Sequence, residues 1–273
     1  MKLFKISDIL GKLNNCIEYK KPFSHIRFGD GGIKFIHSIL FGDDSQLKEI
    51  VHKEGLPWEQ VDKILDLWGY YARRADFIDT PEVYYNGTFW ERIKKPGKGI
   101  SQKTYDRMLM WKELYSRAEF DNDSYCNPES NYLMVLKMEG RKNLLDIMKK
   151  RRICLITARP YVKSFLRNYN IDIVEIAAQY ENQYLKSFDN VIKIIKDNAP
   201  HYDFWLVAAG ELGRIYSGYI KECGGRSLDI GFIIEYWLGE PIHPRLKIFM
   251  KENFRNELEL ILTDEGMKFL RYI

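Results

Sequence analysis

The segment RFGDGG, at residues 27–32, combines an arginine and an aspartate with three glycines. It follows an apolar run that predicts a strand and precedes a pattern that predicts a helix. Arg27 can bind a phosphate through two parallel hydrogen bonds or pair with a neighbouring carboxylate, and Asp30 can coordinate a divalent cation or accept hydrogen bonds from a ligand. A second interpretation is a tight glycine turn in which Asp30 caps the following helix. The segment alone leaves both interpretations open.

A second candidate segment, FWLVAAGELGR at residues 204–214, places small residues between a predicted strand and a predicted helix. Such a turn can hold an anion, because the first amide groups of a helix point toward the ligand. Gly210, Glu211 and Gly213 would then lie near a nucleotide. The segment lacks the first glycine of the dinucleotide-binding motif, and small residues at such turns often serve packing alone. Packing is the better explanation when this segment is considered by itself.

Polar groups also follow two other predicted strands. The segment SLDIGFIIEYW, at residues 227–237, carries Asp229 and Glu235 on either side of a glycine, so two carboxylates would lie near one strand end. Asp229 can instead cap the next helix, and Glu235 can be a solvated helix residue. Thr157 and Arg159 directly follow the apolar run ICLI. As a set, these strand ends are more informative than any one of them.

The second half of the chain alternates predicted strands with predicted helices, as successive βαβ units do. The predicted strands are residues 151–158, 172–178, 204–210 and 227–231. The predicted helices between them are residues 161–169, 187–198 and 213–225. The strands are almost entirely apolar, which is typical of a parallel sheet covered by helices on both faces. Ligands bind outside the carboxyl ends of such strands, so we expect the polar residues described above to converge there.

The first half of the chain is predicted to be mainly helical around one strand at residues 23–28. Further helices are predicted at residues 1–15, 31–40, 57–78, 103–120 and, near the end of the chain, 242–254. Residues 77–102 mix proline, glycine, aromatic and lysine residues, which is typical of a long functional loop or lid. No repeat or linker divides the sequence. We therefore predict one domain over residues 1–273, with a helical and loop insertion at about 46–150 and a C-terminal extension at about 239–273.

Composition excludes several classes of protein. Apolar residues make up 45% and charged residues 29% of the 273 residues, a balance typical of a globular domain. The net charge of +4 suits an anionic small molecule but is far below that of a dedicated nucleic-acid-binding protein. The four cysteines show no metal-site spacing, and no apolar stretch approaches the roughly 20 residues of a membrane span. We expect a soluble, cytoplasmic protein, and a homo-oligomer is compatible with the sequence.

Taken together, these segments resemble the GT-D fold glycosyltransferases, bacterial enzymes that glucosylate sugar chains on a surface adhesin. The family's R-[FY]-G-D-G-E signature is matched by Arg27, Phe28, Gly29, Asp30 and Gly31. Its later D-I-G-H-containing segment is matched by Asp229, Ile230, Gly231, Glu235 and Tyr236. LVAAGELGR is similar to the family's glycine turn, and residues 177–195 are similar to a family loop and the helix that follows it. The resemblance runs in order from residue 23 to about 238.

The resemblance implies an α/β fold, with a Rossmann-like, mostly parallel sheet that has helices on both faces and a helical insertion. It implies transfer of a hexose, most simply glucose, from a UDP-sugar to an acceptor hydroxyl. With the strand-end positions, it predicts catalytic roles for Asp30, Asp229 and Glu235. The residues predicted to bind the donor are Arg27, Phe28, Gly29, Gly31, Gly32, Thr157, Arg159, Gly210, Glu211, Gly213 and Gly231.

The chain departs from the family pattern at two positions. Residue 32 is glycine where the family has the second carboxylate of a metal-binding D-x-E pair, and residue 232 is phenylalanine where the family has histidine. Asp30 would therefore bind Mn²⁺ or Mg²⁺ less well, unless another nearby carboxylate contributes. Arg27 or a lysine can alternatively neutralise the leaving diphosphate without a metal ion.

The acceptor and the reaction class keep alternatives. Residues 77–118 are rich in aromatic and basic side chains, which predicts either an acceptor groove or a solvated loop with its aromatic residues packed inward. The acceptor would be a glycan or glycoprotein, or a hydroxylated base in DNA held by stacking. A nucleotide-binding or S-adenosylmethionine-dependent methyltransferase-like protein stays open, with AAGELGR holding the nucleoside. A non-catalytic member of the family stays open as well.

Overall fold

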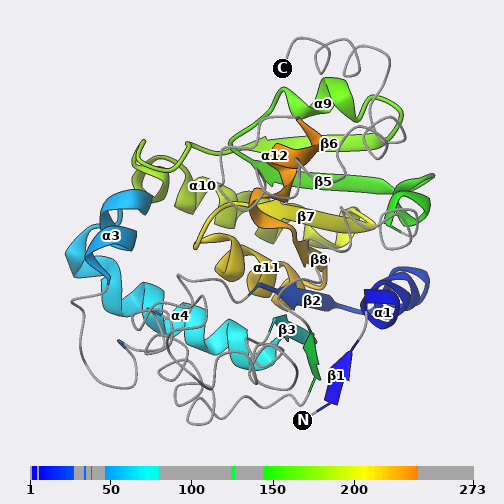
Figure 1. The fold of residues 1–273 in the computed structure, drawn as a ribbon, viewed down its shortest axis with the longest axis horizontal. Coiled ribbons are helices and arrows are strands. Elements are labelled where there is room, and N and C mark those ends of the chain that lie inside the picture. The colour runs from blue at the N-terminus through cyan, green and yellow to red at the C-terminus, as the bar shows by residue number, and fades with distance from the viewer. Residues whose placement is uncertain are drawn as a thin grey trace, which may run out of the picture.

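The computed structural model describes residues 2–4, 6–27, 34, 38, 47–79, 124–126 and 144–238. Within these ranges one sheet has eight strands in the spatial order β1-β4-β3-β2-β8-β7-β5-β6 (Figure 1). The strands are β1 Lys2–Phe4, β2 Phe23–Ile26, β3 Phe77–Asp79, β4 Ser124–Cys126, β5 Arg152–Thr157, β6 Asn170–Glu175, β7 Phe204–Ala208 and β8 Arg226–Asp229. Each neighbouring pair of these strands is parallel. The predicted parallel sheet is confirmed.

Helices cover both faces of the sheet (Figure 1). The described α-helices are α1 Ile6–Glu18, α3 Lys48–Glu54, α4 Val61–Arg74, α9 Val162–Phe165, α10 Gln183–Asn198, α11 Gly213–Glu222 and α12 Ile234–Trp237. Short 3₁₀ helices are η2 Trp58–Gln60, η4 Ala199–His201 and η5 Gly231–Ile233, and residues 144–148 are helical. Helices α3, α4, α10 and α11 pack on one face, and α1, α9 and α12 on the other. The predicted α/β class is therefore confirmed.

Successive side chains of each central strand enter two different cores. In β5, Cys154 and Ile156 pack with α10 and α11, whereas Ile153 and Leu155 pack with α1 and α9. All four side chains are buried. Because both faces of the strand are covered, both must be apolar. This is why the sequence shows a continuous apolar run here instead of an alternating pattern.

The connections between strands place one set of strand ends side by side. From β5 the chain passes through α9 to β6 at the edge of the sheet, and α10 then returns it to β7 on the other side of β5. Helix α11 leads on to β8, which pairs with β2. The winding direction therefore reverses between β5 and β7. In open α/β sheets, ligands bind outside the strand ends at such a reversal.

Several predicted boundaries are wrong where an element depends on distant partners. Residues 2–4 form a strand instead of the start of a helix, and α1 begins at Ile6. Residues 77–79 form β3 instead of a helix end and loop, because the extended backbone of Ala75 ends α4. Helix α3 was not predicted. Strands β1 and β3 have three residues each. They form by pairing with β4 and β2, respectively, and a local sequence pattern does not reveal such pairing.

Other predictions fall partly or wholly beyond the described residues. The helices predicted at 103–120 and 242–254 lie outside them, as does most of the predicted lid. Of the helix predicted at 31–40, Lys34 and Ser38 are described, and both are helical. The single domain, the insertion and the C-terminal extension stay predictions. No helix in the described part of the chain is both long enough and apolar enough to span a bilayer.

Candidate functional site

The carboxyl ends of β2, β8, β7 and β5 are adjacent and carry most of the candidate residues that the structure describes. Thr157 at the end of β5 pairs with Ala208 at the end of β7. Val207 pairs in turn with Asp229, the last residue of β8. Arg27 directly follows β2, which is the next strand in the sheet. Sheet register thus brings together residues that are up to about 200 positions apart, as the 202-residue separation of Arg27 and Asp229 illustrates.

Arg27 and Asp229 lie at the centre of these adjacent strand ends. The Arg27 amide donates to Oδ2 of Asp229 at 3.2 Å, and the Arg27 Nε lies 3.3 Å from Oδ1. Asp229 is 1% exposed, and the Arg27 guanidinium lies 5.1 Å from the centre of the Phe232 ring. Of the two roles expected for Arg27, the structure shows the pairing with a carboxylate. Asp229 does not cap the next helix, since the N-cap residue of η5 is Ile230.

Gly231 makes room for Arg27. It adopts a left-handed backbone with φ +50°, and a Cβ at this position would lie 1.9 Å from Nη2 of Arg27. A side chain here would therefore displace the guanidinium as well as strain the backbone. The role predicted for Gly231 in donor binding stays a prediction, but its position beside Arg27 has a clear steric reason.

Arg214, which the sequence analysis missed, links the end of β2 to the turn after β7. Its Nε donates to the Arg27 carbonyl oxygen at 2.7 Å, and its Nη1 donates to the Gly210 carbonyl oxygen at 3.3 Å. Nη1 also pairs with the Glu211 carboxylate. Arg214 is 2% exposed, although it lies in the first turn of a helix. An arginine between apolar positions of a buried helix face was the available sequence signal.

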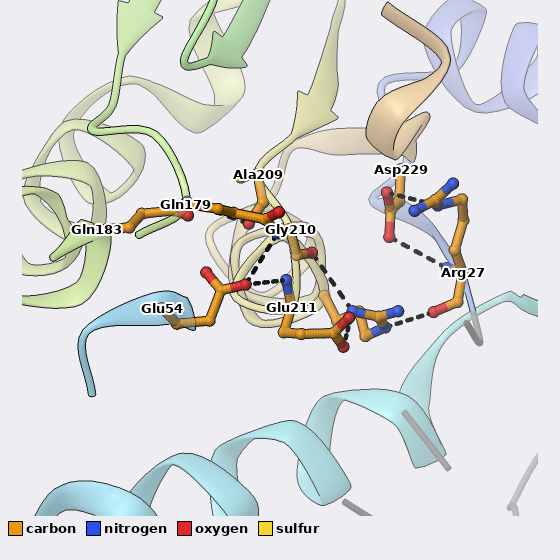
Figure 2. Close-up of polar contacts among 9 residues, drawn as sticks. Arg27, Glu54, Gln179, Gln183, Ala209, Gly210, Glu211 and Asp229 are labelled. Carbon is orange, nitrogen blue, oxygen red and sulfur yellow. Dashed lines mark hydrogen bonds and ion pairs between the residues drawn. The ribbon is translucent and has the colours of Figure 1, made fainter. Parts of the chain in front are cut away.

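Glu54, the last residue of α3, is the second site residue that the sequence analysis missed. Its Oε1 accepts hydrogen bonds from Nε2 of Gln179 at 3.0 Å and from the Glu211 amide at 3.3 Å (Figure 2). Glu54 is 1% exposed. Burial, and then the nearby carboxylate of Glu211, raise the pKa of Glu54 from 4.5 to about 7. No local pattern marks this residue, because its partners lie in loops that are distant in sequence.

The turn after β7 is closed by these contacts. Gly210 has φ +57°, and a Cβ there would lie 2.5 Å from Nε2 of Gln179 and 2.8 Å from Oε1 of Glu54. Gln183 holds the same turn by donating to the Ala209 carbonyl oxygen at 3.2 Å (Figure 2). The Glu211 amide, which would face the ligand if this turn held an anion, donates to a carboxylate of the protein itself.

Arg159 and Glu235 form a second ion pair, between the β5–α9 turn and α12. Their Nη2 and Oε1 atoms are 3.5 Å apart, and the side chains are 26% and 13% exposed. Oγ1 of Thr157 accepts the Arg159 amide at 3.0 Å and so orders this turn. Gly213 serves packing, since a Cβ there would lie 3.2 Å from Cγ1 of Val207. Direct ligand contacts by these residues stay predictions.

The first signature lies mostly outside the described part of the chain. Phe28, Gly29, Asp30, Gly31 and Gly32 belong to the residues that the structure leaves undescribed, so only Arg27 of that segment is placed. The catalytic and metal-binding roles predicted for Asp30 stay predictions.

The described carboxylates do not fit a divalent cation in this arrangement. Asp229, Glu211 and Glu235 are each paired with an arginine, which compensates the negative charge that Mn²⁺ or Mg²⁺ would need. Within the ranges 2–27, 47–79 and 144–238, as far as they are described, no three histidine, cysteine or acidic residues cluster as metal ligands. The same arrangement suits an anion better, because the cationic side chains of Arg27 and Arg159 are 12% and 26% exposed.

Comparison with solved structures identifies the fold. The chain is similar to "A New Glycosyltransferase (DUF1792) from Streptococcus sanguinis", with a TM-score of 0.62 and 13% identity over 98% of this chain and 97% of that one. It is similar to a structure described as "The highly conserved domain of unknown function 1792 has a distinct glycosyltransferase fold", with a TM-score of 0.52 and 15% identity. A selenomethionine-substituted DUF1792 structure gives 0.57 and 17%. The last two likenesses each cover 86% of this chain and 79% of the other.

Searches against protein-family models and curated proteins find no match. At identities of 13–17%, the likeness to solved structures establishes the fold and does not by itself establish the activity. The resemblance to the GT-D fold, recognised from the sequence, is confirmed at the level of the fold.

Proposed function

We propose that this protein is a glycosyltransferase that moves a hexose, most simply glucose, from a UDP-linked donor to a hydroxyl group of an acceptor. One observation supports this most directly. Two partly exposed arginines, Arg27 and Arg159, follow strands on either side of β8 and β7, and each is held by a carboxylate. Both arginines lie at the strand ends of a fold that this chain shares with structures described as glycosyltransferases.

The reaction explains why cations would be needed there. In glycosyl transfer the bond between the anomeric carbon and a diphosphate oxygen breaks, and the diphosphate leaves with the electron pair. The acceptor oxygen forms the new bond to the anomeric carbon and gives up its proton to a base. Fixed cations stabilise the negative charge that grows on the leaving group, which is often the largest catalytic contribution. We assign this role to Arg27, supported by Arg159.

The carboxylates then divide into two groups. Asp229 and Glu235 orient the two arginines, in addition to the catalytic roles predicted for them from sequence. Asp30 is the candidate for contact with the sugar or with a divalent cation, and it lies outside the described residues. Because Asp229, Glu211 and Glu235 are each paired with an arginine, we assign no step of the reaction to a metal ion.

The proposed reaction also requires an acceptor, and two classes of acceptor are considered. A glycan or glycoprotein is the class that the resemblance suggests, and a hydroxylated DNA base is the alternative. We place the acceptor groove in residues 77–118, of which residues 80–118 lie outside the described ranges. Binding to duplex DNA that weakens steeply with added salt would favour the nucleic-acid acceptor.

The methyltransferase-like alternative has less support. It requires the AAGELGR turn to hold a nucleoside, yet the Glu211 amide in that turn donates to Glu54 and the Gly210 carbonyl oxygen accepts from Arg214. The two groups that would contact the nucleoside are thus already engaged. Stabilisation of the protein by S-adenosylmethionine, and not by UDP or UDP-glucose, would reverse this preference.

The proposal is tested by measuring UDP release from a panel of UDP-sugars, with Mn²⁺, with Mg²⁺ and with a chelator. We expect release with at least one donor, and a loss of about 100-fold in kcat for Arg27→Met, the range seen when one stabilising donor is removed. Arg151→Met is the matched control, because Arg151 also pairs with a carboxylate, Glu18, but lies at the amino end of β5.

Two results would contradict the proposal. The first is the absence of both UDP release and thermal stabilisation with every nucleotide sugar tested. The second is an Arg27→Met variant as active as the Arg151→Met control. Binding of a donor without any turnover would identify the non-catalytic alternative.

A further inference from the structure

Glu54 keeps one buried carboxylate oxygen that has no hydrogen-bond partner among the residues that the structure describes. Both of its described donors, Nε2 of Gln179 and the Glu211 amide, bind Oε1. Its Oε2 is buried and accepts no hydrogen bond from the described part of the chain. An ionised carboxylate in this setting would leave a charged oxygen unsolvated, which is costly. A neutral acid fits better, because its carbonyl oxygen accepts both bonds and its proton occupies the second oxygen.

A continuous chain of contacts leads from Glu54 to the arginine at the centre of the site. Glu54 binds the Glu211 amide, the Glu211 carboxylate pairs with Arg214, and Arg214 donates to the carbonyl oxygen of Arg27. Figure 2 shows Glu54, Glu211 and Arg27 in this sequence, from α3 across the turn after β7 to the end of β2. A shift of the turn would therefore reach the backbone of Arg27.

We propose that Glu54 is a positioning residue for sugar transfer: its carboxyl group fixes the turn after β7 and, through Arg214, the place of Arg27. This inference rests on the proposed function. It assigns Glu54 no contact with the substrate. Crowding around Gly210, where a Cβ would lie 2.8 Å from Oε1 of Glu54, shows that the turn fits closely against this carboxyl group.

The charges around Glu54 make its hold on the turn dependent on pH. Glu211 disfavours ionisation of Glu54, and Lys53 on its own helix favours it less strongly. Tyr216 of α11 also interacts electrostatically with Glu54, and its buried hydroxyl has no hydrogen-bond partner within the described ranges. Burial first, and then the Glu54 carboxyl group, raise the pKa of Tyr216 well above its ordinary value. The nearby cation Arg214 is engaged with Glu211. As the pH rises past about 7, Glu54 ionises and the neutral form that suits the site is lost.

The test compares the wild-type protein with Glu54→Gln, which keeps an acceptor for both donors but cannot ionise. We measure kcat/KM for UDP release and the thermal midpoint Tm, each at pH 6 and pH 8.5. The ratio of kcat/KM, variant over wild type, should rise by up to about 30-fold between these pH values, because a group that titrates near pH 7 is about 97% ionised at pH 8.5. The difference in Tm, variant minus wild type, should also rise by several degrees.

Two further variants separate positioning from general stability. Glu54→Leu removes the acceptor, so it should lower kcat at both pH values, whereas Glu54→Gln should not lower it at pH 6. Glu59→Gln, which changes an exposed carboxylate on η2, serves as the control. Its kcat/KM ratio and its Tm difference, each relative to wild type, should be the same at both pH values. A Tm difference that varies with pH while the kcat/KM ratio stays flat would overturn the positioning role. A Tm difference equal at both pH values would overturn the inference altogether. If wild type releases no UDP from any donor, the proposed function fails, and the Tm comparison still reports separately on Glu54.

Discussion

The two ends of the parallel strands hold their arginines in different ways. We call the side of the sheet where the strands begin the amino edge and the side where they end the carboxyl edge. At the amino edge, Arg226 begins β8 and is 4% exposed. It donates to the carbonyl oxygens of Tyr202, Asp203 and Pro200 at 2.6, 2.7 and 3.5 Å. Burial lowers the pKa of Arg226, and the charge of Asp203 opposes this only in part. This arginine closes loops with neutral acceptors and is typical of a structural residue.

At the carboxyl edge, the arginines meet carboxylates and leave atoms unsatisfied. Nε of Arg27 and Oδ1 of Asp229 are 3.3 Å apart and form an ion pair without hydrogen-bond geometry. Both atoms are buried, and neither has a hydrogen-bond partner among the described residues. Oε2 of Glu54 is likewise buried and has no hydrogen-bond partner in the described part of the chain. Such unpaired capacity costs stability, and proteins retain it mainly where function needs it. Arg226 thus has neutral acceptors whereas Arg27 has a buried counter-ion, and this contrast supports placing the site at the carboxyl edge.

The largest expected effect comes from removing one charge of the carboxyl-edge pair. Asp229→Asn keeps a side-chain oxygen but leaves Arg27 without its counter-ion, at a side chain only 12% exposed. Breaking a buried pair by removing one partner costs about 3 kcal/mol. Urea denaturation at pH 7.5 should show a loss of this size in the free energy of unfolding, and kcat for UDP release should fall as well.

The amino edge supplies the comparison for that variant. Glu18 pairs with Arg151 there, and the Glu18 side chain is 52% exposed. Glu18→Gln should change the free energy of unfolding by no more than about 0.5 kcal/mol, because water screens an exposed pair. Equal losses from the two variants would show that the edges do not differ in the way described.

Two glycines that flank β8 sharpen the comparison. Gly224 precedes the strand and Gly231 follows it, with φ values of +82° and +50°. Alanine at either position strains the backbone by about 1–2 kcal/mol. A Cβ at Gly224 meets nothing within 4 Å, whereas a Cβ at Gly231 would meet the guanidinium of Arg27. Gly231→Ala should therefore lose about 10-fold or more in kcat/KM beyond its loss of Tm, and Gly224→Ala should lose Tm alone.

Much of the fold can be predicted from sequence because it is encoded by local patterns. Strands β5 and β7 are apolar on both faces, and helices α10 and α11 have the spacing of an amphipathic helix, so each was recognised from its own residues. Strands β1, β3 and β4 were missed, since three residues carry no pattern of their own. Their conformation follows from pairing with neighbours that are distant in sequence.

The site is predictable in a similar, partial way. The rule that ligands bind at the carboxyl ends of parallel strands correctly indicated that Arg27 and Asp229 would meet. It did not indicate Glu54 or Arg214, because neither residue directly follows a strand. Glu54 belongs to α3, and its partners Gln179 and Glu211 are 125 and 157 residues away. Contacts of this kind are visible only once the helix is packed on the sheet.

The smallest expected effect concerns how strongly the carboxyl-edge charges act on one another. The folded protein raises the pKa of Glu54 from 4.5 to about 7, so from pH 4.5 upward the unfolded chain releases this proton first. Stability should therefore fall as the pH rises through this interval, by about 3 kcal/mol in all.

Glu211→Gln removes the second-largest cause of the shift in the pKa of Glu54 and leaves burial, the largest, in place. The midpoint of this decline should thus move to lower pH, while staying above 4.5. Urea denaturation from pH 4 to 8.5 measures that midpoint, with Glu175→Gln, an exposed carboxylate at the end of β6, as the control. An unchanged midpoint in Glu211→Gln would mean that burial alone governs Glu54.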